Sequence, residues 1–143
     1  MTADEEPHKA LLCEYVQECW IDGNFDRLDD FVAPDYVEHY PATPHDIEGI
    51  EGHRANIEQF REAFPDMEIE FERIVASGNK TAQLFTCRGT HEGKLMGTPP
   101  TGEPVEFLAI GITVWEDGKM VEDWSQVGML TMMEQLGLAP GGG

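Results

Sequence analysis

Residues 105–127 read VEFLAIGITVWEDGKMVEDWSQV, and this stretch decides the class of fold. Residues 105–115 are almost continuously apolar and β-branched, which predicts a strand covered on both faces. Asp117-Gly118 is a strong signal for a two-residue hairpin turn. We therefore expect the chain to return through residues 120–127 as the antiparallel partner of the first strand.

The residues before this hairpin predict two more strands. Residues 67–72 alternate apolar and acidic side chains, and this period of two is typical of a half-buried strand. Gly78-Asn79 predicts a hairpin turn, and a long strand over about residues 81–91 follows it. Residues 92–104, EGKLMGTPPTGEP, are rich in glycine and proline and are expected to form a loop. That loop is either a lid over a pocket or a passive connection.

The first half of the chain has helical rather than strand periodicity. Apolar residues recur at helical spacing in three stripes, over residues 11–20, 25–32 and 50–64. Gly23, Pro34 and Pro65 follow these stripes and are expected to end the helices. Residues 35–41 suggest a short extended stretch, and a last helix is expected over 129–136. Helices followed by long antiparallel strands indicate an α+β fold, with helices packed on a curved, mostly antiparallel sheet that encloses a cavity.

The length of 143 residues corresponds to one domain, 1–143, with flexible ends expected at 1–7 and 138–143. No apolar run approaches the roughly 18 residues that a membrane span needs. The acidic, polar first nine residues do not resemble a secretory signal, so we expect a cytoplasmic protein.

The charge is the unusual part of the composition. The chain has 28 acidic and 9 basic residues, a net charge of −19. This balance disfavours nucleic acids, because phosphate binding needs lysine and arginine, and it disfavours anionic membranes. The acids are spread in short groups, which indicates a solvated acidic shell. Such a shell is tolerable in screening salt and predicts a halophilic source.

Several motifs, taken in order, connect the chain to a known family. They are Gly89-Thr90-His91-Glu92-Gly93, residues 97–102 (GTPPTG), residues 118–124 (GKMVEDW) and Gln135-Leu136-Gly137. The ordered set resembles the SnoaL-like polyketide cyclases, also called ester cyclases, of the NTF2-like superfamily. The resemblance implies a cone-shaped fold, a homodimer formed through the sheet, and a small hydrophobic ligand or substrate. It also implies ring closure by intramolecular aldol condensation, with no metal and no organic cofactor.

The sequence departs from this family at one position. In the cyclases the tryptophan of the last strand is followed four residues later by an aspartate, whereas here Trp124 is followed at that position by Gly128. The period of two predicts that Trp124, Gln126 and Gly128 share the face that lines the pocket. The same reasoning predicts that Asp123 points the other way.

Two histidines are the candidate catalytic bases, since histidine titrates near neutral pH. His39 lies where the family often has a pocket histidine, although a surface histidine beside Glu38 is an equal interpretation. His91 either faces the cavity or stabilises the following glycine-rich loop, and we favour the structural role. The expected pocket is lined by Trp20, Phe107, Trp124, Gln126 and Gly128. Core packing is the competing role for Trp124 and Phe107.

The sequence leaves two functions open. The first is a cyclase- or isomerase-type enzyme that performs cofactor-independent acid–base chemistry on a small hydrophobic carbonyl compound. The second is a non-catalytic protein that binds a small molecule and lacks the family's aspartate. His39, His45 and His53 match no familiar metal-ligand spacing, and no glycine-rich phosphate motif supports a nucleotide cofactor.

Overall fold

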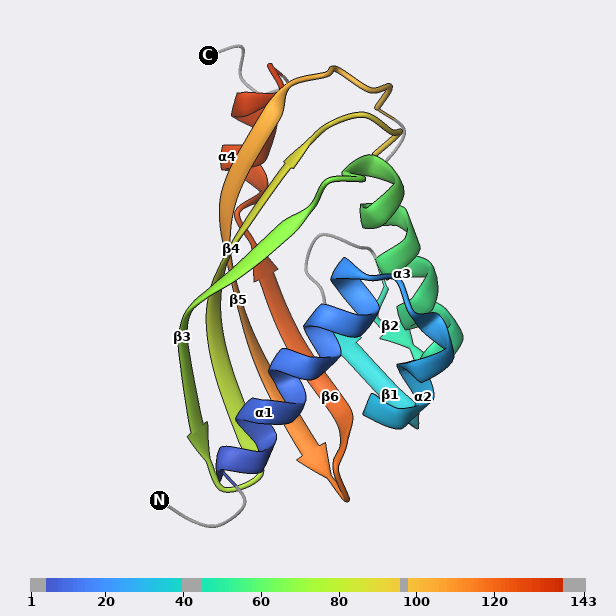
Figure 1. Ribbon diagram of the computed structural model, residues 1–143, viewed down its shortest axis with the longest axis vertical. Helices are drawn as coiled ribbons and strands as arrows, with labels where there is room; N and C mark the ends of the chain where they lie inside the picture. Colours follow the sequence, from blue (N-terminus) through green and yellow to red (C-terminus); the bar gives the residue numbers. More distant parts are fainter. Residues whose placement is uncertain (1–4, 40–44, 96–97, 138–143) are drawn as a thin grey trace.

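The computed structural model describes residues 5–39, 45–95 and 98–137 (Figure 1). The helical elements are α1 (Glu5–Tyr15), the π-helical turn η1 (Val16–Ile21), the 3-10 turn η2 (Phe25–Arg27), α2 (Leu28–Phe31), α3 (Gly49–Ala63) and α4 (Met129–Gln135). The strands are β1 (Val32–His39), β2 (Ile47–Glu48), β3 (Glu68–Ser77), β4 (Lys80–Thr90), β5 (Pro104–Glu116) and β6 (Lys119–Val127). The tail expected at 138–143 lies outside the described residues, and residues 5–7 belong to α1.

The six strands form one curved sheet in the order β2-β1-β6-β5-β4-β3. All neighbouring pairs are antiparallel except β1 and β6, which run parallel. Helix α1 packs against β3 and β4, and α3 packs beside β1 and β2 (Figure 1). The predicted α+β fold with a curved, mostly antiparallel sheet is therefore confirmed.

The turn at Asp117-Gly118 and the helix ends at Gly23 and Pro65 are also confirmed, whereas Pro34 lies inside β1 and the helix before it ends at Phe31. Gly23 has φ +70° just after η1, and α3 ends at Ala63, before Pro65. Asp117 and Gly118 have φ of 53° and 80°, as a type I′ turn requires at both central positions.

Strand β5 differs from its prediction. Its side chains alternate between buried and exposed, and Leu108, Ile110 and Ile112 are each about half exposed, at 53%, 48% and 45%. The prediction that both faces are covered is wrong for the single chain. The helices α1 and α3 cover the inner face of the sheet, and no described element covers the outer face of β5.

Two further features were not predicted, namely strand β2 and the parallel pairing of β1 with β6. This pairing joins segments that lie more than 80 residues apart, with partners such as Glu38 and Asp123. A local hydrophobic period does not specify such a contact. The pairing determines the site, because it places two acidic side chains next to each other.

Buried apolar residues form two clusters. The first cluster includes Tyr15, Tyr36 and Met120, and the second includes Phe60 and Phe107. Within the described residues, no helix is long and apolar enough to cross a membrane.

Candidate functional site

A cavity lies between the helices and the inner face of the sheet, and both core clusters contribute to its wall. Its volume is about 860 Å³, counting the open mouth. Most of the wall is apolar, with side chains that include Leu12, Val16, Trp20, Phe60, Met67, Ile69, Phe71, Phe85, Phe107 and Val127. Apolar cavities with a few polar groups are the usual sites for small ligands.

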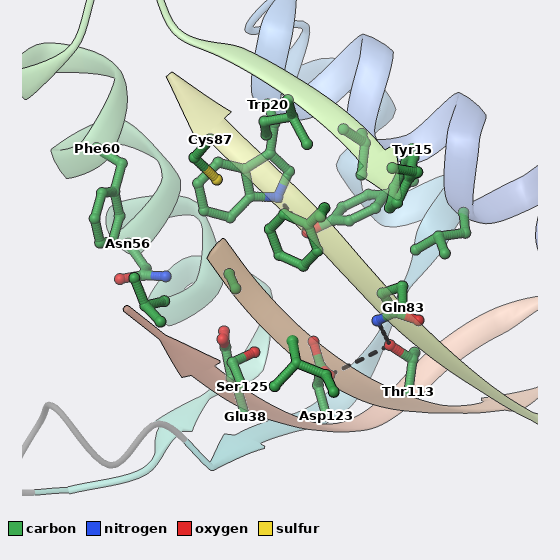
Figure 2. Close-up of a pocket in the computed structure, with 18 of the residues that line it drawn as sticks. Tyr15, Trp20, Glu38, Asn56, Phe60, Gln83, Cys87, Thr113, Asp123 and Ser125 are labelled. Atoms are coloured by element: carbon green, nitrogen blue, oxygen red, sulfur yellow. Dashed lines mark hydrogen bonds between the residues drawn. The ribbon is translucent and has the colours of Figure 1, made fainter. Parts of the chain in front are cut away.

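Two carboxyl groups lie together in this wall. Glu38 on β1 and Asp123 on β6 are direct partners in the parallel register, so both side chains point to the same face of the sheet. The hydroxyl of Tyr36 lies between them, 3.4 Å from Glu38 Oε1 and 3.4 Å from Asp123 Oδ2. Figure 2 shows Glu38 and Asp123 side by side at the floor of the cavity.

Burial raises the pKa of Asp123 well above its ordinary value, and the neighbouring charge of Glu38 raises it further. Hydrogen bonds from Thr113, Tyr36 and the backbone of Trp124 act in the opposite direction, but their effect is smaller than that of burial. Two neighbouring carboxyl groups resist ionising together, because their negative charges repel each other. The pair therefore keeps a proton at pH values where an exposed aspartate has lost its own.

A chain of hydrogen bonds reaches Glu38 from the helices. Trp20 Nε1 donates to the Tyr15 hydroxyl over 2.8 Å, and that hydroxyl contacts His53 Nε2. The Tyr15 hydroxyl can donate its own proton to Nε2, and in that tautomer the histidine proton lies on Nδ1. His53 Nδ1 lies 3.3 Å from Glu38 Oε1, without the alignment of a full hydrogen bond. The arrangement directs a donor toward Glu38.

A second chain reaches Asp123 from the sheet. Gln83 Nε2 donates to Thr113 Oγ1 over 2.9 Å, and Thr113 Oγ1 donates to Asp123 Oδ1 over 3.3 Å (Figure 2). Because the single threonine proton goes to the carboxyl, the glutamine must present its NH₂ group to the threonine. Asp123 is thus held on both oxygens, by Thr113 and by Tyr36.

This arrangement places two neighbouring carboxyl groups in an apolar surrounding, and the pKa of one of them, Asp123, is raised. Such a pair provides an acid and a base without any cofactor. Cys87 also lines the cavity, but burial raises the pKa of its thiol to about 12, which makes it a poor nucleophile. Among the residues that the structure describes, no group of three or more His, Cys, Asp or Glu side chains is placed to hold a metal ion.

Of the five residues predicted for the pocket, two line the cavity and three do not. Trp20 and Phe107 line the cavity. Trp124, which is 44% exposed, and Gln126 lie on the outer face, so their prediction as pocket residues is wrong. The phase of β6 is the opposite of the predicted one, because Asp123, not Trp124, faces inward.

The prediction took its phase from Gly128, and that position does not line the cavity. Gly128 follows the end of β6 and precedes α4, and its N–H donates to Leu108 O over 2.8 Å. A Cβ atom at Gly128 would lie 2.9 Å from the same carbonyl oxygen. The backbone turns here, so the alternation of the strand does not extend to this residue.

His39 lies outside the cavity. Its ring stacks on Trp124 with 4.9 Å between centroids, Nε2 lies 2.7 Å from Glu122 Oε2, and Nδ1 lies 3.1 Å from Asp46 Oδ2. The hydrogen bond that His39 donates to the Glu122 carboxylate raises the pKa of His39. The geometry matches the surface interpretation of this histidine.

His91 is fully buried but does not line the cavity either. Its N–H donates to Glu103 O, its carbonyl accepts from Gly102, and its Nδ1 lies 3.0 Å from the Thr101 hydroxyl. These contacts hold the two ends of the 92–103 segment together. The N–H groups of Glu92 and Gly93 donate to Ala63 O, which fixes the start of the segment to the end of α3.

Sequence reasoning missed the residues that form the polar wall, which are Tyr15, Glu38, His53, Asn56, Gln83, Thr113, Asp123 and Ser125. One signal could have identified Glu38. It lies two residues after Tyr36 on an extended stretch, so it shares the face of a large aromatic residue that is expected to be buried. Asp123 could be placed only once the pairing of β6 with β1 was known.

Comparisons with known proteins agree with this architecture. The sequence profile described as SnoaL-like polyketide cyclase matches residues 10–136. Among curated proteins, no relative matches the sequence. A solved structure named as a candidate SnoaL-like polyketide cyclase, from Jannaschia sp. CCS1, is 22% identical with a TM-score of 0.89, covering 98% of each chain.

Two Streptomyces structures are more similar in sequence. IdmH from Streptomyces antibioticus, named as a candidate polyketide cyclase, is 31% identical with a TM-score of 0.79, covering 91% of this chain and 98% of IdmH. AclR from Streptomyces galilaeus, named as a candidate hydroxylase, is 28% identical with a TM-score of 0.82, covering 95% and 84%.

Proposed function

Because the chain belongs to the SnoaL-like polyketide cyclase family, we propose that it is an enzyme that performs acid–base chemistry without a cofactor in this cavity. The substrate is a small, mainly hydrophobic compound with a carbonyl group. One observation supports the proposal above all others, namely the pairing of Asp123 with Glu38 in an otherwise apolar wall.

The two carboxyl groups have complementary roles in this proposal. The ionised Glu38 removes a proton from the carbon next to the substrate carbonyl, and the protonated Asp123 donates its proton to the carbonyl oxygen. The resulting enol either attacks a second carbonyl in the same molecule, which closes a ring, or is reprotonated elsewhere, which isomerises the substrate. The high pKa of Asp123 suits the donor role, because a proton must be present before it can be given.

A second candidate function is the binding of a small molecule without chemistry. Gly128 favours it, since the family's aspartate is absent there. One fold also hosts many functions, and AclR, with the same fold, is named for hydroxylation. The carboxyl pair nevertheless favours an enzyme, since a purely apolar ligand would gain nothing from two buried acids.

Proton exchange distinguishes the two candidates. 2-Tetralone, a small bicyclic ketone with an acidic α-hydrogen, is incubated with the protein in D₂O, and loss of the α-hydrogen signal is followed by ¹H NMR. We expect the wild type to accelerate exchange, and Glu38→Gln and Asp123→Asn each to reduce the rate by about 10²–10⁴-fold. The control His39→Ala, outside the cavity, retains the wild-type rate. Saturable binding of the ketone without exchange would instead support the binding function.

We also propose that the protein is a homodimer formed through the outer face of the sheet. Leu108, Ile110, Ile112 and Trp124 are exposed together on neighbouring strands β5 and β6. Large exposed apolar patches are typical of interfaces. A second copy covering this face would also explain why β5 is apolar on both sides.

A further inference from the structure

The charged side chains in the cavity wall are acidic, and one histidine lies beside them. Among the lining residues that the structure describes, Glu38 and Asp123 are the acidic side chains, and there is no lysine or arginine. His53 is the one lining residue that can carry positive charge, and its Nδ1 faces Glu38. The wall therefore offers carboxyl oxygens to a ligand and no fixed cation.

The rest of the wall favours the same kind of ligand. Six aromatic side chains line the cavity, namely Tyr15, Trp20, Phe60, Phe71, Phe85 and Phe107. The faces of aromatic rings attract cations, and tryptophan does so most strongly. Aromatic rings around a carboxylate are the usual surroundings of a bound ammonium group.

An anionic ligand would meet opposing forces at each stage. The net charge of −19 repels it during approach. Inside the cavity it would add a negative charge beside the two carboxyl groups, and no arginine or lysine among the described lining residues is placed to pair with it.

We infer that the ligand of this cavity carries a protonated amine on a hydrophobic body, and that the amine binds against Glu38 and Asp123 from the cavity side. This inference rests on the proposed function in taking ligands to bind in this cavity. It concerns a ligand that occupies the carboxyl pair, because a bound ammonium group favours the ionised form of Asp123 and leaves it no proton to give to a carbonyl oxygen.

Binding of a cation has a measurable consequence for the carboxyl pair. Asp123 pairs with Glu38 in the strand register, hydrogen-bonds with Tyr36 on β1 and Thr113 on β5, and interacts electrostatically with Tyr15 on α1, while His53 faces Glu38. The charge of Glu38 disfavours a second negative charge on Asp123. An ammonium group neutralises one of these charges, so both carboxyls can ionise. Amine binding should therefore release a proton, whereas binding of a neutral ligand should not.

Three probes that differ in a single group test the inference. These are 2-naphthylmethylamine, 2-naphthalenemethanol and 2-naphthoic acid, and their binding is measured by isothermal titration calorimetry in about 1 M KCl, which screens the charges on the surface. We expect the amine to bind about tenfold more tightly than the alcohol, and the acid to bind at least about tenfold more weakly. Titrations in two buffers of different ionisation enthalpy, at pH 5 to 8, should show release of up to one proton per amine and none for the alcohol.

Variants identify the groups responsible. Glu38→Gln and Asp123→Asn should each abolish the preference for the amine while the alcohol still binds. The matched control Glu122→Gln removes the neighbouring acid, which lies beside His39 and does not line the cavity, and should keep the preference. The inference is overturned if the acid binds as tightly as the alcohol, if no proton is released, or if Glu122→Gln acts like Asp123→Asn. None of these probes needs to react, so the outcome is independent of whether the protein catalyses exchange.

Discussion

The substitution Asp123→Asn should stabilise the protein at neutral and alkaline pH, although it removes a proposed catalytic group. Burial and the charge of Glu38 hold the pKa of Asp123 well above its usual value of 3.8. The folded protein therefore keeps a proton that the unfolded chain has lost, so folding becomes less favourable as the pH rises above about 4. Asparagine is uncharged and does not incur this cost.

The size of the effect follows from two opposing contributions. Each unit by which the folded pKa exceeds the unfolded one costs about 1.4 kcal/mol once the pH is above both values. Against this, asparagine can still accept from Thr113 and can donate to Tyr36, and these contacts are long, at 3.3 Å and 3.4 Å. Weak bonds of this kind contribute at most about 1 kcal/mol each. Relief of the buried charge should therefore exceed any loss.

Urea denaturation of both proteins at pH 4 and pH 8, in the same salt, measures the difference. We expect the two free energies of unfolding to be similar at pH 4 and the variant to be the more stable at pH 8. The neighbouring acid Glu122, which pairs with His39 outside the cavity, provides the control, since Glu122→Gln should not make the protein more stable than the wild type at pH 8. A variant that is less stable than the wild type at pH 8, or a difference that does not change with pH, would show that Asp123 is not held at a raised pKa.

Three other outcomes follow from the fold and the charge. The melting temperature should rise between about 0.1 M and 2 M KCl, because salt screens the repulsion of a net charge of −19, and an unchanged or lower value would contradict a halophilic source. Ile110→Lys places a charge on the exposed face of β5 and should convert a dimer into a folded monomer in sedimentation velocity; a wild type that is already monomeric would refute the proposed interface. Gly93→Ala should cost at least about 1–3 kcal/mol of unfolding free energy, because its Cβ would lie 2.0 Å from Glu62 O. A loss below half a kcal/mol, roughly, would mean that the 92–103 segment adjusts freely.

The sequence was informative where the relevant interactions are local. The turn at Asp117-Gly118 and the helix end at Gly23 could both be predicted, because each needs a residue that adopts a positive φ. The carboxyl pair could not be predicted, because it depends on the parallel pairing of β1 with β6. The phase of β6 was wrong because it was taken from Gly128, where the chain has already left the strand. His39 attracted notice through its residue type, whereas its neighbour Glu38 lines the cavity.

The central claim is that Asp123 and Glu38 form one acid–base unit inside the cavity. The most direct test is a pH titration of the Asp123 side-chain carboxyl carbon by ¹³C NMR, in the wild type and in Glu38→Gln. We predict that Asp123 titrates well above the range of an exposed aspartate, about 4, and that its pKa falls when the charge of Glu38 is removed. A wild-type Asp123 that titrates near 4, or one that is unaffected by Glu38→Gln, would contradict the claim.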